Sequence, residues 1–438
     1  MDPLLITLIM FSSMFLLLLT GFPIAFILGS VGMLSGLIFW GPFSLELMYF
    51  ATMEVMRNWV LIAVPLFLFM GYVLHESGVA DDLFDAVVKW GGGLRGGLGM
   101  GTIVICAIIA AMAGISGAAT LSMGVIALPA MLSRNYDKKI AVGLVQAGGA
   151  LGFLIPPSMM MIYYAFISGD SVGRLFAGGV VPGLMLAGMY IIYIGVRCYF
   201  QPHMGPGLPL GQRAGLHEKL MATKALLLPG MVIATVMFCI FTGVTSPTEA
   251  AAVGAAGALV CAAVKGRLSW ELIRKTSLDT LNLSGFTAWM IMAAVVFSKV
   301  YSGLGASAMI RSFITGLDMN PWVILLMMQA SFFLLGMVMD DIAILFLCMP
   351  IYVPIIKALG FNPVWFAILY VVNMQMAFLT PPYGVNLFYM KAVAPDNVTI
   401  GDIYTSVIPF VLIQLLGLIL LMMFPGLVLW LPDYIFNG

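Results

Sequence analysis

Small hydroxyl side chains and consecutive prolines lie inside long apolar stretches at two places in the chain. The first place holds Ser116, Thr120 and Pro156-Pro157-Ser158, and the second holds Thr380-Pro381-Pro382. Two prolines in a row remove two backbone donors and interrupt a helix, which frees carbonyl groups. Hydroxyl and carbonyl oxygens together can surround a small cation without adding charge, so the pattern predicts cation sites at two broken helices.

The composition places these breaks in a membrane. Of the 438 residues, 62% are hydrophobic and only 9% are charged, whereas a soluble domain carries about 25% charge. The chain is therefore predicted to be an all-α polytopic membrane protein surrounded by a lipid bilayer. Its net charge is zero, which gives no reason to expect a nucleic-acid partner. The five cysteines have no metal spacing, and the N-terminus lacks the features of a signal peptide.

Apolar segments predict the membrane spans, and four elements stand apart from them. Two pairs of short arms, each below the roughly 20 residues of a full span, predict re-entrant hairpins at about 99–132 and 322–356. Their tips are expected at Gly114–Thr120 and Gly336–Asp341. Broken helices are expected at about 140–168 and 363–394. The simple spans are predicted at 4–19, 24–40, 60–74, 175–200, 225–243, 250–264, 283–300 and 404–431, and residues 81–90 form an amphipathic interfacial helix.

The order of these elements repeats. Pro156 recurs as Pro381, 225 residues later, and Pro182 recurs as Pro409, 227 residues later. We therefore predict two repeats, 1–200 and 224–438, joined by a cytoplasmic connector at 201–223. Each repeat holds about five transmembrane helices plus one hairpin, and an odd number of spans makes the repeats inverted. Placing both termini outside leaves all basic residues cytoplasmic except Arg57, Arg174, Lys299, Arg311 and Lys357, as the positive-inside rule favours.

Several motifs resemble one family. In chain order, "GISGAAT", "FLIPPS", "TSPTEAAAVGA", "MDDIAIL" and "FLTPPYGVNLF" resemble the large membrane subunit of TRAP (tripartite ATP-independent periplasmic) transporters, over essentially the whole chain. The resemblance implies an elevator-type, sodium-coupled transporter in a bacterial or archaeal inner membrane. It also implies a small four-helix membrane subunit, a periplasmic substrate-binding protein and a small organic acid substrate. One departure is Ala119, where many members have a serine.

Candidate site residues follow from the breaks and hairpin tips. The predicted ion-binding residues are Ser116, Gly117, Thr120, Pro156, Ser158, Gly336, Asp340, Thr380 and Pro381, and the predicted substrate-binding residues are Pro157, Asp341, Pro382 and Asn386. Serines and threonines in membrane helices also bond their own backbone, so packing is the alternative for the hydroxyls. For Asp340 and Asp341 the alternative is that the tip reaches the lipid headgroups.

The sequence also narrows the function. It contains no nucleotide-binding loop, nucleophile elbow or zinc motif, so we expect no catalytic residue and no organic cofactor. Asp340-Asp341 is the only central titratable pair, which favours sodium over a proton as the coupling ion. The alternative function is a stand-alone ion-coupled carboxylate carrier. Glu249, three residues after Ser246, is predicted to complete a helix capping box.

Overall fold

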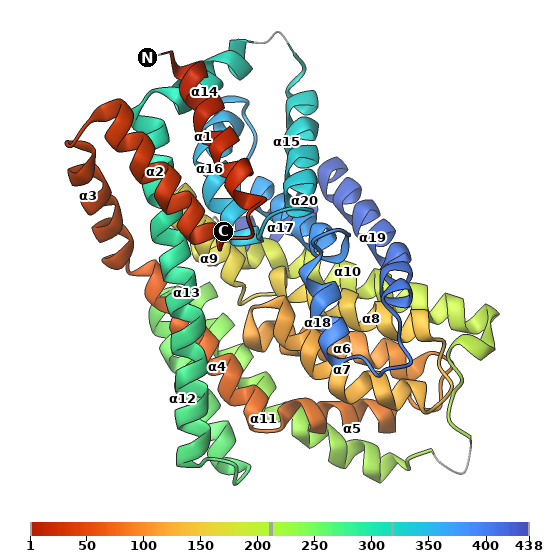
Figure 1. The fold of residues 1–438 in the computed structure, drawn as a ribbon. Helices are drawn as coiled ribbons and strands as arrows, with labels where there is room; N and C mark the ends of the chain where they lie inside the picture. The colour runs from red at the N-terminus through yellow and green to blue at the C-terminus, as the bar shows by residue number, and fades with distance from the viewer. Residues whose placement is uncertain (1, 210–212, 317–318, 437–438) are drawn as a thin grey trace.

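The computed structural model describes residues 2–209, 213–316 and 319–436, and these residues form helices and no strand (Figure 1). Residues 210–212 of the predicted connector lie outside the described part. Among the described residues, five helices are long and apolar enough to cross a membrane, or seven if two bent pairs each count as one span. The all-helical, multi-pass prediction is confirmed at this level.

The first half contains ten α-helices. They are α1 (Pro3–Leu18), α2 (Ile24–Trp40), α3 (Ser44–Met56), α4 (Ala63–Glu76), α5 (Val79–Gly91), α6 (Gly97–Ala113), α7 (Ser116–Leu132), α8 (Lys138–Ala150), α9 (Met159–Ser168) and α10 (Val172–Phe200). Single 3₁₀ turns at Val60–Ile62 and Leu151–Phe153 precede α4 and follow α8.

The second half begins after a short 3₁₀ turn at Pro202–Met204. Its helices are α11 (Leu216–Phe241), α12 (Pro247–Val264), α13 (Trp270–Gly303), α14 (Ala306–Gly316), α15 (Pro321–Gly336), α16 (Asp341–Ala358), α17 (Pro363–Leu379), α18 (Val385–Val393), α19 (Ile400–Met423) and α20 (Gly426–Phe436). A short helix, a hairpin, a broken helix and a long helix thus follow one another in both halves. Figure 1 shows the hairpin α15–α16 and the hairpin α6–α7 at opposite ends of the molecule.

Several predicted boundaries differ from the structure. The span predicted at 60–74 is preceded by another helix, α3, which bends by 54° into the following segment. Glu46, Glu54 and Arg57 dilute the apolar signal of α3, which is why hydropathy missed it. The span predicted at 283–300 begins earlier, at Trp270, and α11 begins inside the predicted connector. The closing span divides at Phe424-Pro425 into α19 and α20.

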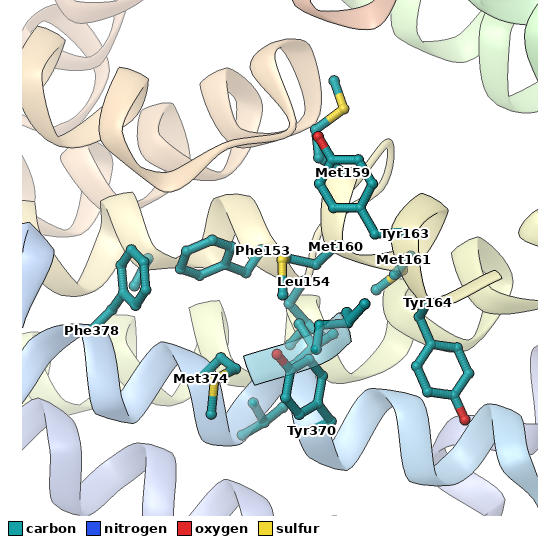
Figure 2. Packing of buried hydrophobic residues seen from close by; sticks show 14 of the residues in the cluster. Phe153, Leu154, Met159, Met160, Met161, Tyr163, Tyr164, Tyr370, Met374 and Phe378 are labelled. Atoms are coloured by element: carbon teal, nitrogen blue, oxygen red, sulfur yellow. The ribbon is translucent and has the colours of Figure 1, made fainter. Parts of the chain in front are cut away.

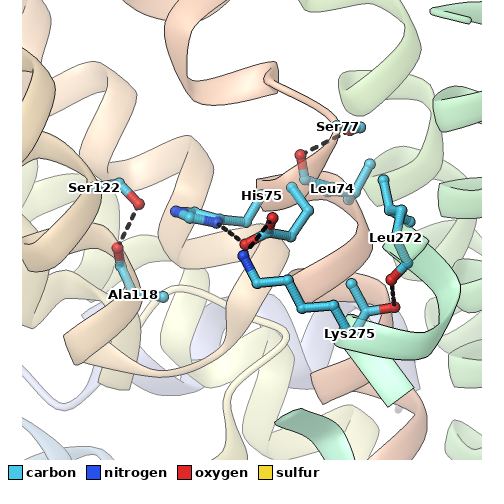
Figure 3. A network of polar contacts seen from close by, with 9 residues as sticks. Leu74, His75, Ser77, Ala118, Ser122, Leu272 and Lys275 are labelled. Carbon is cyan, nitrogen blue, oxygen red and sulfur yellow. Dashed lines mark hydrogen bonds and ion pairs between the residues drawn. The ribbon is translucent and has the colours of Figure 1, made fainter. Parts of the chain in front are cut away.

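Ion pairs connect the neighbouring ends of α4, α5, α12 and α13. The Lys275 ammonium of α13 lies 2.9 Å from Glu76 of α4, and the His75 imidazole lies 3.7 Å from the same carboxylate (Figure 3). Lys265 pairs with Asp82 in the same region. The predicted capping box of α12 is confirmed, since Glu249 accepts from the Ser246 backbone N–H while the Ser246 hydroxyl accepts from the Glu249 N–H.

The broken helices form the centre of the structure. Every residue of α17 after Pro363 is buried, and α8 is buried from Ile140 to Ala150. A helix that is apolar on all sides belongs in such an interior. Small residues permit close packing there: a Cβ added at Gly143 of α8 would lie 2.3 Å from the Ser406 carbonyl oxygen of α19. The first Pro-Pro break is therefore enclosed by protein, whereas the second is buried only up to the end of α17.

Candidate functional site: hairpin tips against broken helices

The tip of the first hairpin is a tight turn of two residues. Gly114 ends α6 with a φ of +66°, a conformation that glycine adopts without steric cost. Ile115 is extended, and α7 begins at Ser116. The predicted polar tip is therefore shorter than expected, because Ser116, Gly117 and Thr120 already belong to the first turns of α7. The backbone N–H groups of Ser116 and Gly117 are among the donors at the N-terminus of α7 that have no partner within the helix.

The first Pro-Pro break lies directly against this tip. The Pro156-Pro157 peptide bond is cis, and both prolines and Ser158 are buried. The Ser158 hydroxyl donates to the Phe153 carbonyl at 2.5 Å and so satisfies one of the carbonyls that the break frees. The Met159 N–H donates to the Gly114 carbonyl at 3.2 Å. Ser158 is thus occupied in bridging the break, as the packing alternative expects.

The second Pro-Pro break is more open. The Pro381-Pro382 bond is also cis, but Pro381 is half-buried and Pro382 is exposed. The Thr380 hydroxyl donates to the Met376 carbonyl of its own helix at 2.7 Å. Because α18 starts right after Gly384, Asn386 lies in its first turn and is fully buried.

A chain of polar side chains connects the two halves at the first tip. The Ser116 hydroxyl donates to the Asn386 amide oxygen at 3.0 Å. The Asn386 amide nitrogen lies 3.4 Å from the Gln146 carbonyl of α8, and the Gln146 side chain donates to the Ser406 hydroxyl at 3.3 Å. The chain links α7, α18, α8 and α19, so it holds elements of both repeats around the tip. Ser406 had no sequence signal beyond an isolated serine in an apolar helix.

Two buried oxygens of this group lack a protein hydrogen-bond partner, the Gln146 amide oxygen and the Thr120 hydroxyl. The side chain of Thr120 is fully buried. A Cβ built on Gly149 would lie 1.9 Å from the Thr120 hydroxyl oxygen. The backbone of α8 therefore lies directly against the hydroxyl, with no side chain between them. A buried polar atom without a partner is costly. The arrangement fits an additional ligand held by Thr120 and neighbouring carbonyls.

The second tip carries the two aspartates. Asp340 is the N-cap of α16, and its carboxylate accepts from the Ile342 N–H at 3.2 Å. Asp341 is buried, and its carbonyl accepts from the Tyr370 hydroxyl at 2.7 Å. Gly336 packs against Ala377, where an added Cβ would lie 2.4 Å from the alanine methyl group. Capping accounts for one carboxylate, whereas the side chain of Asp341 lines a cavity.

That cavity lies where the two hairpin tips meet the first break. It measures about 60 Å³, and its walls include Gly114 and Ile115 of the first tip, Asp341 of the second tip, and Phe153 and Tyr163 beside the break. Phe153 also meets Phe378 of the second broken helix edge-to-face, with ring centroids 4.7 Å apart (Figure 2). The tertiary structure therefore brings together both tips and both breaks.

The predicted site residues fall into two groups. Around the first tip lie Ser116, Gly117, Thr120, Pro156, Pro157, Ser158 and Asn386, and around the second break and second tip lie Gly336, Asp340, Asp341, Thr380, Pro381 and Pro382. Gly117 faces the Tyr389 ring of α18, where an added Cβ would lie 2.8 Å from a ring carbon. No cluster of three or more His, Cys, Asp or Glu suited to a metal occurs within the described residues.

Hairpins that meet broken helices inside an apolar, multi-pass fold define the class of membrane transport proteins. The chain belongs to the family of the tripartite ATP-independent periplasmic transporter, DctM component, whose family model matches residues 11–427. The resemblance inferred from the motifs is thereby confirmed.

The chain is similar in sequence to two named relatives and in fold to one solved structure. It is 34% identical to the C4-dicarboxylate TRAP transporter large permease protein DctM of Pseudomonas aeruginosa, covering 93% of this chain and 94% of the relative. It is 29% identical to the ectoine TRAP transporter large permease protein TeaC of Halomonas elongata, covering 98% and 100%. The YdaH transporter of Alcanivorax borkumensis shares the fold, with a TM-score of 0.64 at 17% identity over 89% of this chain and 90% of that one.

Proposed function

We propose that this chain is the sodium-coupled large subunit of a TRAP transporter that imports a small organic acid. The observation that carries the proposal is the orphaned Thr120 hydroxyl at the first hairpin tip. It lies against the bare backbone of α8, beside the Ser116–Asn386 hydrogen bond. Sodium prefers uncharged oxygen ligands, and helix breaks supply them.

The proposed sodium site lies at the first tip. Thr120 supplies the hydroxyl, and backbone carbonyls near Gly149 and Pro156 complete the cage; Ser116 orients the tip through Asn386. The second cage, around Thr380, Pro381 and the turn from Gly336 to Asp340, is the counterpart in the other half. Thr380 reaches this cage only if its hydroxyl leaves the Met376 carbonyl.

The proposal is tested by driving uptake with one gradient at a time. Proteoliposomes containing this chain, its small membrane subunit and the binding protein are given either an imposed sodium gradient or an imposed pH gradient. Uptake should follow sodium, and Thr120→Val should raise the sodium concentration for half-maximal uptake. A matched control is Thr7→Val, because Thr7 lies in α1 and bonds Pro3 and Tyr301 away from both tips. Uptake that follows only the pH gradient, and is lost in Asp340→Asn, would refute sodium coupling.

The partners are proposed from the family. A tripartite transporter has a small four-helix membrane subunit and a periplasmic binding protein in addition to the large permease. We expect the isolated chain to take up nothing measurable under a full sodium gradient. Robust uptake by the chain alone would instead favour the stand-alone carboxylate carrier.

The orientation and motion are proposed as follows. The repeats are inverted, both termini lie outside the inner membrane, and the hairpins with the broken helices move as an elevator against the remaining helices. Ion pairs between helices lie near both ends of α13, as this placement expects of a helix that crosses the membrane. Lys275 pairs with Glu76 and Lys265 with Asp82 on the side predicted to be cytoplasmic, while Lys299 pairs with Glu54 on the opposite side.

A further inference from the structure

A second cavity adjoins the one between the hairpin tips. It measures about 340 Å³ and extends along α13, with walls that include Asn58, Ser284 and Thr287. Tyr163 and Thr287 line both this cavity and the 60 Å³ cavity that contains Asp341. The two cavities are therefore adjacent, and the side chains of Tyr163 and Thr287, which both carry hydroxyl groups, line both of them. The larger space lies within the range of small-molecule pockets, roughly 300–1,000 Å³.

One polar group along these walls lacks a protein partner, whereas the Tyr163 hydroxyl interacts with the Thr287 side chain. The Ser284 hydroxyl is buried without a protein hydrogen bond. Ser284 and Thr287 are three residues apart on α13, so they occupy the same helix face. Figure 2 shows Tyr163 with its hydroxyl turned away from Tyr164 and Tyr370. Three hydroxyl-bearing residues thus border the shared space, and hydroxyl groups can donate to a carboxylate.

The residues that line the two cavities include one acidic side chain and no basic one. Asp341 is the only Asp, Glu, Lys, Arg or His among the residues that line the two cavities. It is 5% exposed, so water screens its charge poorly. Apart from the sodium ions proposed at the two tips, the walls supply no positive charge to offset a second carboxylate near Asp341, whereas a cationic group would be attracted to Asp341 itself.

We propose that the two joined cavities form a substrate site for a zwitterion: a small molecule with one carboxylate and one cationic group. Its cationic end lies toward Asp341, and its carboxylate accepts hydrogen bonds from Thr287, Ser284 and Tyr163. This inference rests on the proposed transport function and narrows its substrate class. It separates this chain from a carrier of dicarboxylates, although one relative is named for those.

The test measures ligand binding and sodium binding on the same sample. The chain is purified with its small membrane subunit, and thermal stability is followed in sodium with ectoine, proline or β-alanine as zwitterions and with succinate or fumarate as dianions. At least one zwitterion should raise the melting temperature, and neither dianion should. Asp341→Asn and Thr287→Val should each weaken zwitterion binding at least tenfold, while Thr287→Ser should restore it to within about threefold.

The control is Thr280→Val on the same helix. The Thr280 hydroxyl is buried and bonds the Thr276 carbonyl, and it lines neither cavity. This variant should leave zwitterion affinity unchanged. Stabilisation by a dianion, by no probe at all, or equally in Thr287→Val would overturn the assignment. Stabilisation by sodium without any organic probe is measured first, and its absence would refute the sodium-coupled function and not the substrate class.

Discussion

Gly152 offers a direct test of the contact between the first hairpin tip and the first broken helix. It lies in the 3₁₀ turn after α8, and it has no side chain to separate the turn from the tip. A Cβ built there would lie 2.6 Å from the Ile115 carbonyl oxygen, 2.8 Å from its carbon and 3.1 Å from the Ser116 nitrogen. All three atoms are backbone, so no flexible side chain can yield. Gly152→Ala must displace the tip itself.

The expected cost follows from the size of that displacement. Ordinary contact begins at 3.4 Å, so the tip must retreat by about 0.8 Å, and overpacking of this kind costs about 1–3 kcal/mol. The same movement would stretch the 3.0 Å bond from Ser116 to Asn386 to as much as about 3.8 Å, beyond hydrogen-bonding distance. Losing that buried bond costs about 1–3 kcal/mol more. We therefore expect a total destabilisation of about 2–6 kcal/mol.

The assay is equilibrium unfolding in mixed micelles, together with the sodium concentration for half-maximal thermal stabilisation. Gly152→Ala should lower the free energy of unfolding and weaken sodium binding. The matched control is Gly188→Ala in α10, where an added Cβ meets nothing within 4 Å. Alanine there should be neutral or stabilising by up to about 1 kcal/mol. If the two variants have the same stability and the same sodium midpoint, the packing argument is wrong.

Three further predictions address other parts of the structure. Ser246→Ala should destabilise α12 by about 0.5–2 kcal/mol, because it removes the capping hydroxyl; a full loss of transport in a stably folded variant would contradict a purely structural role. Ala118→Cys and Val338→Cys should react with membrane-impermeant thiol reagents from opposite sides, as the proposed inversion of the repeats requires; reaction of both from one side in every transport state would exclude inversion. Lys299→Ala should change stability by less than about 1 kcal/mol, because the pair with Glu54 is half exposed on both sides; thermal unfolding of the variant measures this, and a larger loss would show that the pair is more than a surface contact.

The local features of this protein follow from its sequence. Pro156-Pro157 and Pro381-Pro382 must interrupt their helices wherever they lie, because proline lacks the donor that a helix requires. Composition alone requires a membrane. The expectation that the hairpin arms are too short to span it agrees with α6, α7 and α15 but is wrong for α16, whose 18 residues are long and apolar enough to cross. The capping box at Ser246 and Glu249 depends on residues three apart. All of these are properties of neighbouring residues, and the ordered motifs were enough to indicate the family.

Tertiary structure alone decided how the candidate residues are used. Ser116 meets Asn386 across 270 positions of sequence, and Thr120 is left without a partner. The Ser158 hydroxyl is occupied by a carbonyl on the other side of its break, and the Thr380 hydroxyl by a carbonyl of its own helix. No sequence pattern indicated that Thr287 of α13 and Asp341 at the second tip line one cavity. Such contacts depend on the rotation of each helix about its axis and on how closely two backbones approach. Both are set by packing against distant glycines such as Gly149 and Gly152, and no local pattern encodes them.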